Sequence, residues 1–138
     1  MKMFLYLPVL LLGVAVASDL PRTASNADAE VYIVSPCDGE TLTSPVKVVF
    51  GLRNMGVAPA GVTYPGSGHH HLLIDTPLPD LDLPIPADEH HRHFGKGQTE
   101  VLLELDPGEH ILQLLLGDAL HIPHQPPVFS KKISIIVK

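Results

Sequence analysis

Gly68-His69-His70-His71-Leu72-Leu73-Ile74-Asp75 is the stretch around which the rest of the chain is organised. It is a short apolar run bounded by Gly on one side and Thr76-Pro77 on the other, a pattern typical of a β-strand. Because side chains alternate along a strand, His69 and His71 are expected on one face and His70 on the opposite face. Two imidazoles on one face, about 7 Å apart at the backbone, are close enough to bind one metal ion. The stretch therefore predicts a strand that carries part of a metal site.

Most of the other histidines fall in short downstream groups. His91 and His93 lie in a long Pro-rich connection, residues 76–98, and His121 and His124 lie in a loop near the end of the chain. A long connection without strands of its own is usually functional or disordered, and its histidines favour function. Loops that join different strands of a β-sandwich gather at the ends of the sheets, so these groups are expected to converge. We predict a shared transition-metal site, with four or fewer ligands bound at once, formed by His69, His71, His91, His93, His121 and His124.

The type of ligand indicates which metal to expect. Imidazoles without thiolate suit Cu(II), Zn(II) or Ni(II), and affinity is highest for copper, so copper is the first expectation and zinc the second. Met55 is better interpreted as a gap-filling apolar side chain than as a thioether ligand. The chain has no G-x-S-x-G motif and no base beside Cys37, so no catalytic residue and no binding site for an organic cofactor is predicted.

The remaining segments predict an all-β fold. Pro- and Gly-rich turns separate short runs of aliphatic and β-branched residues, and no part of the mature chain keeps a 3.6-residue period. The turn Asp106-Pro107-Gly108 predicts that residues 99–105 and 109–116 pair as a hairpin. We predict one domain, residues 30–138, folded as an antiparallel immunoglobulin-like β-sandwich of about seven strands. Strands are expected at residues 30–35, 45–52, 68–75, 99–105, 109–116 and 128–137.

The first 17 residues predict a secretory signal peptide. Lys2 precedes an apolar run over residues 4–14, and Ala15-Val16-Ala17 is a small-x-small cleavage motif. Residues 18–29 are small, polar and aperiodic, and are expected to form a flexible leader. The protein is therefore expected to be periplasmic or secreted, with no membrane anchor after cleavage.

Charge and cysteine content limit the expected partners. The formal net charge of −6 argues against nucleic-acid binding, because phosphate contacts need clustered Lys and Arg. Cys37 is the only cysteine, so no intramolecular disulfide can form. The expected partners are a metal ion and, as an alternative left open, another periplasmic protein.

Four motifs together resemble one known family. The chain has G-L-R-N-M-G-V-A-P-A-G at 51–61, G-H-H-H-L-L-I-D at 68–75, H-R-H-F-G-K-G-Q-T-E at 91–100 and L-L-L-G-D-A-L-H-I-P-H-Q-P-P at 114–127. In this order they resemble the bacterial exported family catalogued as domain of unknown function 4399, over nearly the whole mature chain. The resemblance implies a small periplasmic β domain but no established activity. It also implies a set of marker histidines, namely His69, His70, His71, His91, His93, His121 and His124.

Three functions are compatible with these features. The favoured one is a histidine-rich, exported metal-binding protein that acts as a copper or zinc chaperone, buffer or sensor. The first alternative is a redox metalloenzyme of the superoxide type on a β-sandwich, which is less favoured. The second alternative is a non-metal interaction module in which the histidines are incidental.

Overall fold

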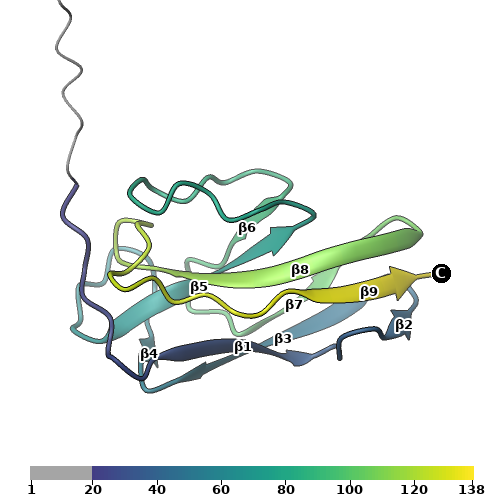
Figure 1. Cartoon of the computed structure of the whole chain (residues 1–138), viewed down its shortest axis with the longest axis horizontal. Coiled ribbons are helices and arrows are strands. Elements are labelled where there is room, and N and C mark those ends of the chain that lie inside the picture. Colours follow the sequence, from purple (N-terminus) through teal and green to yellow (C-terminus); the bar gives the residue numbers. More distant parts are fainter. Residues whose placement is uncertain (1–19) are drawn as a thin grey trace, which may run out of the picture.

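The computed structural model describes residues 20–138, which form nine strands and no helix (Figure 1). The predicted signal peptide at residues 1–17 lies outside this described part. Within residues 20–138, no helix has the length and apolar character needed to cross a bilayer. The strands are β1 (Glu30–Ser35), β2 (Thr41–Leu42), β3 (Val46–Arg53), β4 (Gly56–Val57), β5 (Ser67–Ile74), β6 (His91–His93), β7 (Glu100–Leu103), β8 (Gly108–Gly117) and β9 (Ile133–Val137).

The strands form two sheets that pack face to face. The smaller sheet has the order β1-β3-β7, and the larger has the order β2-β9-β8-β5-β4, with β6 also paired to β5. Neighbouring strands are antiparallel except in the short parallel pairs β2–β9 and β4–β5. Figure 1 shows β1 and β3 in a layer beneath β5 and β8. The predicted antiparallel all-β sandwich is confirmed, while its immunoglobulin-like character stays a prediction.

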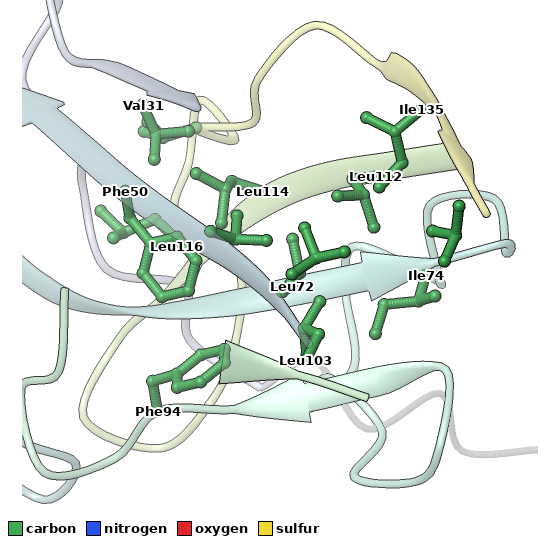
Figure 2. Packing of buried hydrophobic residues seen from close by; sticks show 14 residues of the cluster. Val31, Phe50, Leu72, Ile74, Phe94, Leu103, Leu112, Leu114, Leu116 and Ile135 are labelled. Atoms are coloured by element: carbon green, nitrogen blue, oxygen red, sulfur yellow. The ribbon is translucent and has the colours of Figure 1, made fainter. Parts of the chain in front are cut away.

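The main core lies between the two sheets, because each strand presents alternate apolar side chains to the opposite sheet. Val46, Val48 and Phe50 of β3 are buried on one face, as their spacing predicts. Full burial of each such side chain contributes about 1.5–3 kcal/mol. They pack in one cluster with Val137 of β9 and with residues of β5, β7, β8 and β9 that are labelled in Figure 2: Leu72, Ile74, Leu103, Leu112, Leu114, Leu116 and Ile135.

The predicted hairpin between residues 99–105 and 109–116 is wrong. Strand β7 pairs with β3 in the small sheet, whereas β8 pairs with β5 and β9 in the large sheet. The turn after β7 therefore carries the chain from one sheet to the other. Leu103 and Leu112 both belong to the core cluster, so the two strands bury their apolar faces against each other across the sandwich. Turn residues predict where a chain reverses, but they do not determine which strand it pairs with.

Strand β5 is buried on both faces, and all eight of its residues are buried. Its inner face belongs to the main core. Its outer face is covered by the long connection after β5, where Ile85 packs with Leu73 and Leu115 in a second apolar cluster. The same connection then forms β6, which pairs with β5. This arrangement encloses the outer-face histidines of β5.

Candidate metal centre

His69 and His71 lie side by side on the outer face of β5, and their ring centroids are 4.7 Å apart. Strand β6 pairs with β5 so that His93 lies directly opposite His71. As a result, the Nε2 atoms of His69 and His93 are 3.2 Å apart. One ligand nitrogen from each of these three side chains lies within 4.8 Å of the other two. The strand register thus brings together imidazoles that are more than 20 residues apart in sequence.

His121 brings a fourth ring to the same place. Its ring centroid lies 5.0 Å from that of His69, 4.7 Å from His93 and 6.0 Å from His71. The residue has a left-handed backbone with φ of 67°, which is uncommon for a residue other than glycine. Its amide donates to the Asp118 carbonyl at 2.9 Å, and its carbonyl accepts from the Ile85 amide at 2.8 Å. Two separate loops therefore fix its unusual backbone.

Asp118 organises the loop that carries His121. One carboxylate oxygen accepts hydrogen bonds from the amides of Leu120 and Ile122 at 2.9 and 3.0 Å. The other accepts from the Thr23 hydroxyl at 2.7 Å. Asp118 is buried, so these bonds satisfy a carboxylate that is largely removed from water. These contacts are those of a residue that orients the loop.

The segment expected to form a flexible leader contacts this loop from outside. Arg22 donates through Nε to the Pro123 carbonyl at 3.0 Å and through a second nitrogen to the Asp82 carboxylate at 2.9 Å. Ala24 forms a parallel bridge with Gln125. Residues 22–25 thereby link the loop that carries His121 to the long connection that covers β5.

Two glycines give the histidine rings the space they occupy. A Cβ on Gly117 would lie 2.7 Å from Cε1 of His71, and a Cβ on Gly95 would lie 2.3 Å from Cε1 of His93. Atoms at these separations would overlap, so either substitution would force the adjacent ring to move. Both glycines belong to motifs visible in the sequence, but spacing alone could not relate them to a particular histidine.

Burial keeps these imidazoles in the neutral form that binds metal. Burial, with added repulsion from His121, lowers the pKa of His69 to about 4. Burial, with added repulsion from His69, lowers the pKa of His71 to about 2. Burial and His121 also lower the pKa of His93. The three side chains therefore present lone pairs rather than positive charge at neutral pH.

Several of the buried ring nitrogens have no hydrogen-bond partner among the described residues. These atoms are Nδ1 of His69 and both ring nitrogens of His71. A buried polar atom without a partner costs about 1–3 kcal/mol, so native structures rarely keep one. A bound metal ion accepts the lone pair of a neutral imidazole and removes that cost at one nitrogen of each ring. The donor set thus fits a transition metal, and no carboxylate or thiolate of residues 20–138 belongs to the group.

Two of the predicted ligands lie outside the cluster. Nδ1 of His91 lies 2.8 Å from the Asp88 carboxylate, to which it donates. His124 is buried elsewhere, and its Nε2 donates to the Ser67 carbonyl at 3.0 Å. The structure therefore brings together four of the six predicted residues: His69, His71, His93 and His121.

The remaining histidines have other surroundings. His70 points into the main core, where its ring centroid lies 5.1 Å from that of Phe50. His110 lies 2.7 Å from the Asp75 carboxylate and 2.8 Å from the Asp106 carbonyl. Strand alternation thus separates His70 from its two neighbours, as the sequence predicts.

The chain was compared with protein families, curated proteins and solved structures. A family described as "Domain of unknown function (DUF4399)" matches residues 48–138, a range that contains all four clustered histidines. No curated protein matches, and neither does any solved structure. The match agrees with the family resemblance of the four sequence motifs.

Proposed function

We propose that this chain, which belongs to the DUF4399 family, binds one transition-metal ion through His69, His71, His93 and His121. The proposal rests on the convergence of four histidine rings. Four histidines from β5, β6 and a distant loop lie with all their ring centroids within 6.0 Å of one another. Burying unpartnered imidazole nitrogens costs free energy. A metal ion that binds their lone pairs offsets this cost.

The arrangement supports storage or delivery of the ion. Two ligands are rigid and buried in β5, whereas His93 is exposed and His121 is partly exposed. An ion can therefore enter and leave on the side of His93 and His121, while β5 retains the fixed half of the site. The donor set is compatible with both copper and zinc, the two metals expected from the sequence. The N-terminal sequence features support export, and we propose that the protein acts outside the cytoplasm as a metal chaperone, buffer or sensor.

Calorimetric titration of Zn(II) and Cu(II) into the purified, untagged, metal-free protein tests this function. We expect one ion per chain, with a dissociation constant in the micromolar range or tighter. Competition between the two metals is expected, because both use the same imidazoles. A stoichiometry well below one for both ions, or binding that persists unchanged in a His69→Ala, His71→Ala double variant, would contradict the proposal.

A glycine substitution provides a test that removes no ligand. Gly95→Ala is expected to displace the His93 ring and to lower metal affinity about tenfold, the size of effect seen when a group that orients a ligand is lost. The matched control is Gly56→Ala, because a Cβ on Gly56 meets no atom within 4 Å. Competition with a coloured chelator measures both affinities. Equal loss in the two variants would mean that the Gly95 effect is not specific to the site.

A further inference from the structure

The arrangement of the four rings contains information about the geometry of the bound ion. A Zn–N bond of 2.0–2.1 Å places each imidazole centroid about 3.2 Å from the ion. Four centroids at tetrahedral corners are then all about 5 Å apart. In a square-planar complex, two opposite pairs would instead be separated by about 6.4 Å. When every ring directs a nitrogen at the ion, the centroid separations therefore distinguish the two geometries.

The observed separations match the tetrahedral pattern. The six values are 4.7 Å (His69–His71), 5.0 Å (His69–His93), 5.0 Å (His69–His121), 5.1 Å (His71–His93), 6.0 Å (His71–His121) and 4.7 Å (His93–His121). A square needs two long separations that share no residue. The longest separation is His71–His121, and its complement, His69–His93, is only 5.0 Å.

The hydrogen-bonding contact between His69 and His93 excludes one square arrangement independently. The Nε2 atoms of His69 and His93 are 3.2 Å apart. Two nitrogens bound to one tetrahedral zinc ion are about 3.3 Å apart, whereas opposite nitrogens in a square are about 4.1 Å apart. His69 and His93 therefore cannot lie opposite each other around an ion without moving apart by nearly 1 Å.

The backbone resists flattening of the site. His69 and His71 are fixed in β5 by its pairing with β8, and His93 is fixed in β6 opposite His71. Gly117 contacts the His71 ring closely enough to exclude a side chain at that position. His121 adds the fourth ring, and its centroid lies 4.7–6.0 Å from those of the other three.

We infer that this site selects Zn(II) over Cu(II), with His121 as the fourth ligand of a closed tetrahedral centre. The inference rests on the proposed function and names its metal, replacing the copper expected from the sequence. Zn(II) prefers four tetrahedral nitrogen or sulfur ligands, whereas Cu(II) prefers a square-planar or tetragonal arrangement. A zinc centre with four protein ligands retains its ion without the open position that catalytic zinc sites keep. That closure favours retention of zinc over catalysis.

A variant of His121 tests the inference. Asparagine tolerates the left-handed backbone at this position and removes the imidazole, so His121→Asn is expected to fold like wild type. We expect His121→Asn to weaken Zn(II) binding about 100-fold and Cu(II) binding by less than about fivefold, because three imidazoles and water satisfy Cu(II). His91→Ala is the control and is expected to change neither affinity. Co(II) bound to wild type should give the intense visible absorption of tetrahedral cobalt.

The outcomes separate the two proposals. Equal weakening of Zn(II) and Cu(II) in His121→Asn, or no weakening of either, would overturn the tetrahedral zinc centre while metal binding itself stands. Weak, six-coordinate Co(II) absorption in wild type would overturn it as well. Failure of wild type to bind Zn(II), Cu(II) and Co(II) would instead overturn the proposed function. Circular dichroism and the melting temperature of the metal-free variant establish that it is folded.

Discussion

The metal-free protein is expected to unfold as the pH is lowered from 7 to 5. Burial lowers the pKa of His69, His70 and His71 below the value of about 6.5 that a histidine has in the unfolded chain. The unfolded chain therefore gains protons below pH 6.5 that the folded chain does not, and stability falls with falling pH. The loss continues until the folded pKa is reached, about 4 for His69 and His70 and about 2 for His71.

The expected size of this loss is comparable to the stability of a whole domain. At pH 5 each of the three histidines lowers the free energy of unfolding by about 2 kcal/mol, since a shift of one pKa unit corresponds to about 1.4 kcal/mol. Together they cost about 6 kcal/mol, against a usual total of about 5–15 kcal/mol. His110 acts in the opposite direction. Although partial burial opposes its charge, hydrogen bonds with Asp106 and Asp75 raise the pKa of His110. His110 therefore stabilises the folded state below pH 6.5, and this stabilisation is lost as the pH rises.

His70→Leu is the variant that isolates this effect from the metal site. His70 lies in the main core, and neither of its ring nitrogens has a partner among the described residues. Leucine fills a similar volume without a polar atom, so we expect His70→Leu to be more stable at pH 7 by about 1–3 kcal/mol. The acid midpoint should also move to lower pH. Far-ultraviolet circular dichroism against pH measures both midpoints. An unchanged midpoint in His70→Leu, or a native spectrum at pH 5 in the metal-free wild type, would contradict this prediction.

The sequence predicts the strand-borne part of the site better than the loop-borne part. Alternation along a strand is a fixed property of the backbone, so His69, His71 and the opposite orientation of His70 follow from their positions. The pairing of His93 with His71 depends on the register of β6, which no local pattern specifies. The long connection between β5 and β6 only makes that register possible.

His91 and His124 illustrate why spacing in a loop is a poor guide to ligation. His91 lies on the same face of β6 as His93, but it pairs with Leu73 of β5. Its ring donates to the Asp88 carboxylate, which also accepts hydrogen bonds from the backbone amides of His90 and His91. His124 lies three residues after His121, and the left-handed backbone at His121 redirects the chain between them. The Asp88 carboxylate that binds His91 and the left-handed backbone at His121 both depend on how the loops fold, so the spacing of the histidines does not reveal them.

The sheet assignment of β7 and β8 could not be predicted for a related reason. Asp106-Pro107-Gly108 predicts a chain reversal, and both flanking segments have an apolar face. The two segments can either pair edge to edge within one sheet or pack face to face across a sandwich. The second arrangement encloses Leu103 and Leu112 in the same core, so tertiary burial determines the pairing. Local turn chemistry is compatible with both.

Replacing His71 by alanine is expected to lower metal affinity by about 100-fold or more. Its ring is almost completely buried, and neither nitrogen has a hydrogen-bond partner within residues 20–138. Its centroid lies within 6.0 Å of each of the other three rings. Alanine removes a ligand from the rigid half of the site, which no loop movement replaces. His91→Ala is the matched control, because His91 lies on the same face of β6 as His93 and outside the cluster.

The melting temperature distinguishes loss of a ligand from loss of the fold. At a free metal concentration about 1,000 times the dissociation constant, binding adds about 4 kcal/mol to wild type, a rise on the order of 15 °C. His71→Ala should lose nearly all of this rise, whereas His91→Ala should retain it. Without metal, the melting temperature of His71→Ala should fall by much less than that rise, because the substitution also removes two unsatisfied nitrogens from the interior. If Zn(II) raised the melting temperature of His71→Ala as much as that of wild type, His71 would not be a ligand, and the proposed centre would lose its most buried member.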